Sequence, residues 1–257
     1  MNGDMRRSWV LRPILWYATA SIATTILHEL AHASVAFALG VRSTLFSYRA
    51  DLDLTPAQAA SDLPLLIRIA GPLFSLVCGA LCWLAYRQRR GAPLALPLLY
   101  LSVFGVGTFF GNLLSTPFVG DFSRAATALR LPMSIRYAIA AAGAATVAAL
   151  HWWAGRELAR IVPPRVDRIM GRLGIIVLPV MLGTAAVILV NQPMPGAWVN
   201  ARIAEAGFWF FGVLAALTIR ESTRSTASLY VHWADVLAAL VAALVVRLTV
   251  RGIPFTP

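Results

Sequence analysis

The sequence predicts an all-α polytopic membrane protein with six or seven transmembrane helices and a short membrane-associated β-ribbon after the first helix. Three observations predict this class: 59% of the 257 residues are hydrophobic, only 13% are charged, and the apolar residues gather in runs of about 20. A soluble domain keeps about a quarter of its residues charged. Most of this chain must therefore face lipid, and the composition excludes a large aqueous domain.

Apolar runs long enough to cross a bilayer define the predicted spans. They cover residues 14–39, 63–86, 94–116, 133–153, 173–192, 203–219 and 230–248. Arg12 interrupts the apolar stretch near the N-terminus, and the run then continues to Leu39, so we expect a retained first span rather than a cleaved signal peptide. We expect a multi-pass integral protein of a bacterial cytoplasmic membrane.

The basic residues bear on orientation and on partners. The net charge is +11, and the arginines lie scattered between the apolar runs, without the contiguous basic face that a phosphate backbone requires, so we expect no nucleic acid among the partners. Arginines outside the spans gather on the side that holds the N-terminus, which the positive-inside rule assigns to the cytoplasm. The oligomeric state is left open.

A different pattern follows the first span. From Phe46 to Leu54 apolar and polar residues alternate, which is the period of a half-buried strand, so an extended ribbon is predicted there. Thr55, Pro56 and Gln58 then fit the N-cap, the first helical position and the capping-box partner of a short helix.

The first span contains the sequence HELAH, with His28 and His32 four residues apart and Glu29 beside the first histidine. Imidazoles at this spacing lie on one face of a helix and can both bind one zinc ion, and the glutamate can reach a water on that ion. A structural pair of histidines is the alternative. Polar side chains at membrane depth are costly, which favours a functional zinc site with Glu29 as the catalytic residue.

A catalytic zinc site needs a third protein ligand. Pro117 and Gly120 interrupt the end of the third span, and Asp121 follows on the same side of the membrane as the HELAH helix end. Irregular backbone is tolerated at membrane depth where it lines a buried cavity. We therefore predict Asp121 as the third metal ligand; the alternative is a helix N-cap or an ion pair with Arg124.

Other residues within the spans have simpler interpretations. Gly71, Ser75 and Gly79 form a stripe of small residues, which predicts close packing of the second span against the first or third. We assign no chemistry to the apolar-run thiols Cys78 and Cys82.

Two histidines and one amide remain. His151 and His232 are expected at the membrane interface rather than at a metal site. Asn112 lies within the third span, where its amide can bind a substrate backbone or a neighbouring helix, and the sequence leaves both open.

These features resemble the site-2 protease family of intramembrane zinc metalloproteases. The likeness rests on HELAH at 28–32, the glycine-proline helix at 70–79 and the asparagine-to-aspartate stretch at 112–124, and it covers residues 14–131. It implies a three-span metalloprotease core at 14–131, accessory transmembrane helices at 133–250, Zn²⁺ bound by His28, His32 and Asp121, and Glu29 as general base. The family's site usually opens toward the cytosol, which opposes the orientation favoured by the arginines.

The expected reaction is hydrolysis of a peptide bond in a membrane-anchored protein substrate. Such a substrate must be extended locally before attack, and the ribbon offers an edge for it, with Tyr48 and Leu52, together with Asn112, as candidate substrate-binding residues. Two alternatives stay open. A different membrane HExxH peptidase would take a later glutamate as ligand, and a transporter or assembly factor would use the His and Glu pair for metal or protons. The later glutamates are Glu157, Glu205 and Glu221.

Overall fold

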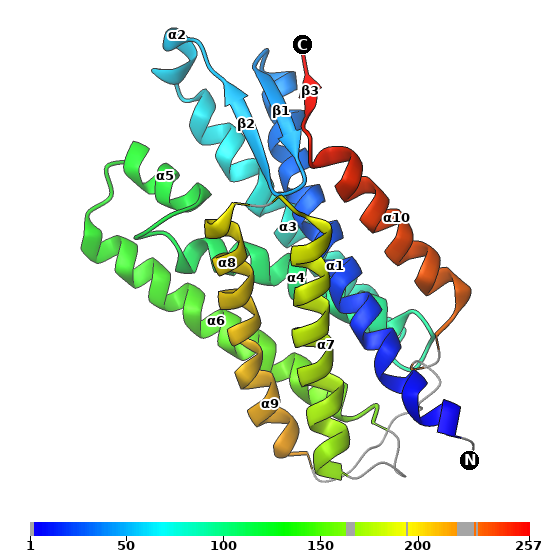
Figure 1. The fold of residues 1–257 in the computed structure, drawn as a ribbon. Coiled ribbons are helices and arrows are strands. Elements are labelled where there is room, and N and C mark those ends of the chain that lie inside the picture. The colour runs from blue at the N-terminus through cyan, green and yellow to red at the C-terminus, as the bar shows by residue number, and fades with distance from the viewer. Residues whose placement is uncertain (1–2, 163–167, 194, 220–228, 230) are drawn as a thin grey trace.

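The computed structural model describes residues 3–162, 168–193, 195–219, 229 and 231–257. These residues form a helical bundle with a small sheet at one end (Figure 1). In chain order the elements are α1 (Gly3–Ala38), β1 (Arg42–Phe46), β2 (Arg49–Asp53), α2 (Pro56–Ala59), α3 (Leu63–Gln88), α4 (Ala95–Leu114), α5 (Asp121–Ala128), α6 (Met133–Ala159), α7 (Arg168–Val190), α8 (Gly196–Gly207), α9 (Trp209–Leu217), α10 (Trp233–Thr249) and β3 (Ile253–Phe255).

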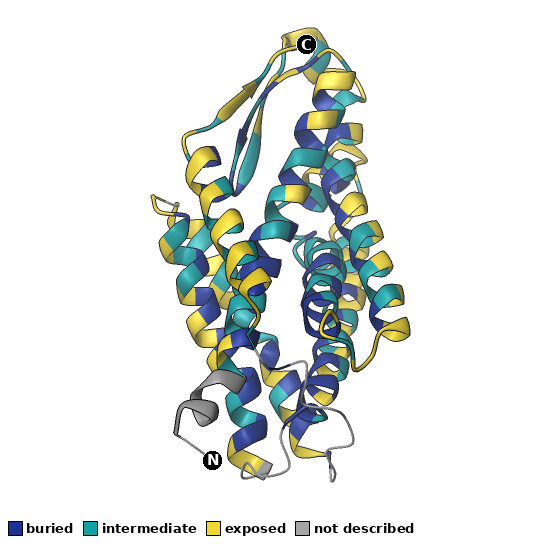
Figure 2. Cartoon of the chain, turned by 90° about the vertical axis from the view of Figure 1, so that its right-hand side faces the viewer, coloured by how far each residue is buried: buried dark blue, intermediate teal, exposed yellow. Residues whose placement is uncertain are grey.

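Within the described residues, five helical segments are long and apolar enough to cross a membrane. They are Val10–Ala38, Leu63–Gln88, Ala95–Leu114, Met133–Ala159 and Ile169–Val190. Many large apolar side chains are exposed. Figure 2 colours the exposed residues yellow, and many of them lie along the outer helices of the bundle. On α3 the exposed apolar side chains include Leu66 and then recur every three or four residues at Leu73, Val77, Leu81 and Leu84. Such a stripe suits contact with lipid, and the predicted polytopic membrane fold is confirmed.

The last two predicted spans differ from the first five. The run at 203–219 is divided at Phe208 between α8, of 12 residues, and α9, of 9 residues. The run at 230–248 forms α10, which has 17 residues. At a rise of about 1.5 Å per residue, a helix of that length falls short of a hydrocarbon core about 30 Å thick. Composition alone could not reveal the division at Phe208 or the short length of α10.

Helix α1 runs through the bundle and packs against α3, α4, α7 and α10. The largest buried cluster lies toward its first half, where the ring of Tyr17 meets the edges of Tyr100 and Phe104. Helices α3 and α4 cross where Gly79 faces Gly105, because a Cβ on Gly79 would lie 2.8 Å from the Gly105 carbonyl carbon. The predicted small-residue stripe is therefore a packing surface.

The segment after α1 is a hairpin rather than the single strand predicted at 46–54. Strands β1 and β2 pair antiparallel from Arg42 with Asp53 to Phe46 with Arg49, and Ser47 and Tyr48 form the turn. The strand β3, from the other end of the chain, pairs with β1. The sheet has the order β2-β1-β3.

A tight, hydrogen-bonded turn connects α1 to β1. Gly40 has a φ of +72°, a conformation that favours glycine. Its N–H donates to the Phe37 carbonyl, and the Val41 N–H donates to the Ala36 carbonyl. These two bonds form a Schellman motif, and the buried Val41 packs with Ala36 and Ile67 as that motif requires. After the hairpin, the predicted capping box between Thr55 and Gln58 begins α2 and is confirmed.

Candidate metal centre

The two histidines of HELAH lie on one face of α1, as their spacing predicts. Both are buried, and their ring centroids lie 4.8 Å apart at 84° to each other. The Nε2 atoms of His28 and His32 lie 3.2 Å apart. Both rings therefore direct the same nitrogen toward one point.

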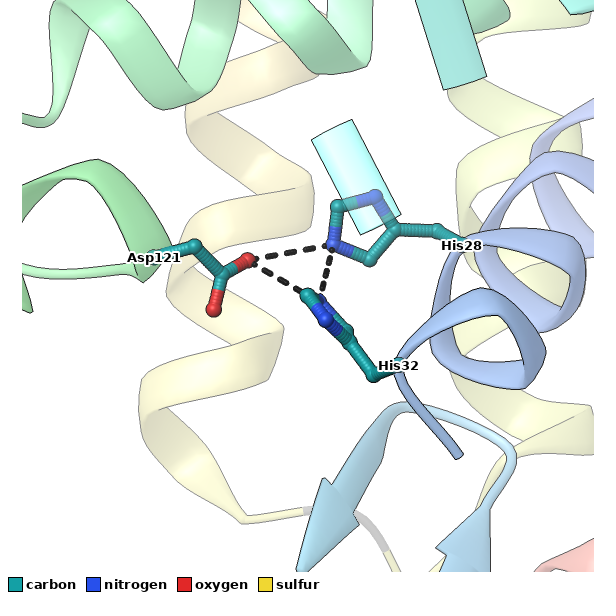
Figure 3. Close-up of side chains that lie close together, drawn as sticks. All are labelled: His28, His32 and Asp121. Carbon is teal, nitrogen blue, oxygen red and sulfur yellow. Dashed lines mark hydrogen bonds and ion pairs between the residues drawn. The ribbon is translucent and has the colours of Figure 1, made fainter. Parts of the chain in front are cut away.

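Asp121 reaches this point from the far end of α4. That helix ends at Leu114, and the chain turns through residues 115–120 before Asp121 begins α5. Its Oδ2 lies 3.2 Å from His28 Nε2 and 3.3 Å from His32 Nε2 (Figure 3). Gly120 is the N-cap residue, and the Asp121 carboxylate pairs with the histidines. The predicted arrangement of three residues is thus present, and neither alternative for Asp121 describes its contacts.

The second nitrogen of each ring has its own partner. His32 Nδ1 lies 2.6 Å from the backbone oxygen of Ile67 on α3. A carbonyl oxygen only accepts, so His32 Nδ1 carries a proton, and Nε2 is the nitrogen that faces Asp121 and would bind a metal once it is unprotonated. His28 Nδ1 lies 3.0 Å from Ser75 Oγ, which supports the corresponding orientation of the second ring.

The geometry of the three atoms fits a tetrahedral cation. Zinc bonds of about 2.0–2.1 Å at tetrahedral angles place neighbouring ligand atoms about 3.3–3.4 Å apart. The three separations here are 3.2, 3.2 and 3.3 Å. Among the described residues this is the group of histidine, cysteine or acidic side chains close enough to hold a metal. The donor set therefore suits zinc, with a fourth position left for water.

The electrostatics of Asp121 agree with this geometry. Burial alone would raise the pKa of the Asp121 carboxyl, but hydrogen bonds from His28 and His32, together with their charge, hold that pKa well below its usual value. Asp121 is also the first residue of α5, where a negative charge is favoured by the helix dipole. The carboxylate is therefore ionised, which is the form that binds a metal.

The sequence did not identify the residues that hold the histidines. Gly71 on α3 leaves room for His32, because a Cβ on Gly71 would lie 2.3 Å from His32 Nε2. Ser75, one turn further along α3, contacts His28. Both belong to the stripe that was interpreted only as helix packing. The one sequence signal for this contact was Ser75 itself, because a polar serine four residues from Gly71 in an apolar helix indicates a polar neighbour.

Glu29 lies in the same polar cluster and is buried. Its carboxylate interacts electrostatically with His28 and His32 and accepts a hydrogen bond from the backbone N–H of Ala50 in β2. The hairpin is therefore in direct contact with the candidate base. This contact links a residue within the bundle to a strand beyond the end of α1.

The three candidate substrate residues lie around the site in different settings. Asn112 donates its side-chain N–H to the Thr108 carbonyl, and its Oδ1 faces Gly120, beside Asp121. Tyr48 is buried in the hairpin turn and packs near Trp198 of α8. Leu52 packs with the apolar cluster at the end of α1. A role for any of them in substrate binding stays a prediction.

The remaining histidine and glutamate candidates lie apart from the three ligands. His151 is buried within the bundle, where its Nδ1 donates to the Val147 carbonyl, and its position at the membrane interface stays a prediction. Glu157 bonds to Tyr86 and Arg160, and Glu205 pairs with Arg202. Glu221 lies outside the described residues.

The geometry of the site agrees with a comparison against known families. The model of the Peptidase M50B-like family matches residues 7–130, which contain all three candidate ligands. This match covers just under half of the chain, and over these residues the chain is similar to that family. The match confirms the likeness to the site-2 proteases, and a metallopeptidase is the class of protein that this likeness implies. Neither the curated proteins nor the solved structures gave a match.

Proposed function

We propose that the protein is an intramembrane zinc metalloprotease that hydrolyses peptide bonds in membrane-anchored protein substrates. One observation carries the proposal. Three ligand atoms, from His28, His32 and Asp121, converge at tetrahedral separations beside a buried glutamate. The family match over residues 7–130 supports the metallopeptidase class independently of this geometry.

The chemistry divides between the metal and the side chains. Zinc held by the three ligands would polarise a carbonyl and lower the pKa of a water molecule to about 7. Glu29 accepts the proton of the attacking water and passes it to the leaving amine. His28 and His32 are oriented by Ser75 and the Ile67 carbonyl, and the burial of both rings excludes bulk water.

The hairpin supplies a means of binding an extended substrate. A helical substrate hides its carbonyl groups in its own hydrogen bonds, so the segment to be cut must unwind first. Strand β2 is an edge strand, and Ala50 within it contacts Glu29. A substrate segment that adds to β2 as a further strand would therefore pass beside the base.

We further propose the domain division, the substrate class and the location that the sequence predicts. Residues 14–131 carry the chemistry, and 133–250 supply accessory helices. The substrate is a membrane-anchored protein, and the protein acts in the bilayer of a bacterial cytoplasmic membrane. The arginine distribution and the family resemblance favour opposite orientations, and a protease-protection assay on vesicles would determine which side the hairpin faces.

The test is a cleavage assay in liposomes with a panel of single-span test proteins, combined with metal analysis of the purified chain. Wild type should hold one zinc per chain and cleave at least one test protein. His28→Ala and Asp121→Ala should lose both zinc and cleavage. Glu29→Gln should keep zinc and lose cleavage, because the ligands stay while the base is removed.

The outcomes separate the proposal from its alternatives. A Glu29→Gln variant that still cleaves would refute the assigned base. Zinc retained by Asp121→Ala would indicate a ligand elsewhere, as a glutamate-type HExxH peptidase requires. A transporter or assembly factor would hold or move metal without cleaving any test protein, whichever of these residues is changed.

A further inference from the structure

The two edges of the described sheet are chemically different. Phe46 and Arg49 flank a two-residue turn and so form a hydrogen-bonded pair. Because such pairs alternate along antiparallel strands, the backbone groups of Ala50 and Leu52 point away from β1. On this edge of β2 the Ala50 N–H is bonded to Glu29, and the Ala50 carbonyl and the Leu52 backbone groups face outward with no further strand of the described sheet beside them. The hydrogen bond between the Ala50 N–H and Glu29 agrees with this alternation.

The opposite edge is closed by the strand β3. By the same alternation, the groups of Ser43 and Leu45 that point away from β2 are paired with Phe255 and Ile253. Pro254 lies opposite Thr44, at the position whose backbone groups point outward from β3. A proline has no N–H to offer there, so this edge is unsuited to a further strand.

The segment that forms β3 is closely fitted to the hairpin. Gly252 has a φ of +87°, and a Cβ at this residue would lie 2.8 Å from a methyl carbon of Thr44 and 2.9 Å from the ring of Phe46. Only glycine combines this conformation with so close an approach. Helix α10, which leads into β3, is fixed at its other end by the ion pair between Asp235 and Arg12 of α1.

We propose that residues 253–255 form a positioning strand, which closes the β1 edge so that an extended substrate can pair only with β2, beside Glu29. The inference rests on the proposed function and adds to it the edge that selects the substrate. Without β3, Ser43 and Leu45 would present a second row of open backbone groups. A segment bound to that row would lie on the far side of β1 from the base, where it cannot be cut.

The test compares Ile253→Pro with Ile253→Ala. Both variants remove the isoleucine side chain, and only proline also removes the N–H that pairs with Leu45. Cleavage is measured with a test protein that the wild type cuts. Substrate position is measured by cysteine crosslinking to the same test protein. The background is the inactive variant Glu29→Gln, in which Cys78 and Cys82 are also replaced by alanine. A single cysteine is then introduced on β1 by Ser43→Cys or on β2 by Asp51→Cys.

Closure of the β1 edge predicts a specific difference. Ile253→Pro should cleave on the order of tenfold more slowly than Ile253→Ala, since one backbone pair of a short strand is lost. In Ile253→Pro the test protein should crosslink to a cysteine at position 43 as well as to one at position 51, and the zinc content should be unchanged. Ile253→Ala should crosslink from position 51 alone and cleave near the wild-type rate.

The other outcomes overturn the inference in distinguishable ways. Equal cleavage by the two variants, with crosslinks from position 51 only, refutes the positioning strand and leaves the protease function in place. If Ile253→Pro loses zinc, the comparison is repeated with a variant that lacks residues 253–255. If this deletion variant also loses zinc, β3 supports the metal site itself rather than selecting the substrate edge. A wild type that cuts no test protein refutes both proposals.

Discussion

Gly71 on α3 leaves the space that the imidazole of His32 occupies. A Cβ at this residue would lie 2.3 Å from Nε2 and 2.6 Å from Cε1 of the ring, which is far inside contact distance. His32 cannot retreat easily, because its Nδ1 is bonded to the Ile67 carbonyl on the same helix. Helices α1 and α3 therefore pack closely around the His32 ring, and no space remains there for a larger residue than glycine.

We predict that Gly71→Ala weakens zinc binding by about 10- to 100-fold, because the methyl group would displace a ligand nitrogen. Zinc affinity measured by competition with a chelator would test this. Gly107→Ala is the matched control, since its Cβ would meet only a Leu150 methyl carbon at 3.7 Å. Equal zinc affinity in the two variants would contradict the fit described for His32.

The residues of the site differ in how far the sequence could predict them. The spacing of His28 and His32 is local, and helix geometry alone places both on one face. Asp121 was predicted from chain order and the position of the helix break. Gly71 and Ser75 were not assigned to the site, because a stripe of small residues indicates that two helices approach and not which side chain fills the space between them.

The hairpin shows why a strand can be predicted and its turn missed. Two turn residues, Ser47 and Tyr48, separate β1 from β2. Residues paired across this turn, such as Leu45 and Ala50, share a face but differ in parity, so the alternation should break at the turn. The break was hidden because Phe46 and Tyr48 are also apolar, and the pattern therefore looked like one strand over 46–54. The pairing with β3 could not be predicted either, since three residues at the other end of the sequence carry too little periodic pattern.

The open edge of β2 makes a prediction for Leu52. Leu52→Pro should reduce cleavage at least tenfold relative to Leu52→Ala, because only proline removes the outward N–H, and neither variant disturbs the bonds between β1 and β2. Cleavage rates and zinc content of the two variants would test it. If both cut equally well, the β2 edge has no part in substrate binding. Tyr48→Pro would be a poorer test, since that side chain is buried in the turn.

At the scale of the whole molecule, one ion pair joins the two ends of the chain. Arg12 Nε donates to Asp235 Oδ2 at 2.8 Å, and both side chains are almost fully buried. Trp16 also donates to this carboxylate. In the sequence Arg12 was only an interruption of an apolar run, since its partner lies 223 positions away.

Loss of this carboxylate should destabilise the fold. We predict that Asp235→Asn lowers the free energy of unfolding by about 3 kcal/mol at neutral pH, because the buried Arg12 charge loses its ion pair with this carboxylate. Thermal unfolding in detergent micelles would measure the change. Asp53→Asn, at an exposed residue of β2, is the control and should unfold like the wild type.

The same pair predicts a dependence on pH. Burial alone would raise the pKa of Asp235, but hydrogen bonds from the His232 N–H, Arg12 and Trp16, with the charge of Arg12, hold that pKa below its ordinary value. The stabilisation is therefore complete above the unfolded-state pKa of about 4 and is lost as the pH falls through the folded-state value. The difference in melting temperature between wild type and Asp235→Asn should stay constant above about pH 5 and shrink as the pH falls below the unfolded-state pKa of about 4. A difference that does not shrink there would contradict the pair's contribution.

The end of α1 sets the distance and the rotation between the metal ligands and the strands. His32 and Gly40 are joined by continuous helix and a Schellman turn, so each residue added between them would rotate the hairpin by about 100° and shift it by about 1.5 Å. A single insertion would carry the Ala50 amide off the face that bears Glu29. The number of residues between His32 and Gly40, more than their identity, therefore keeps the edge of β2 aligned with Glu29 and the metal ligands.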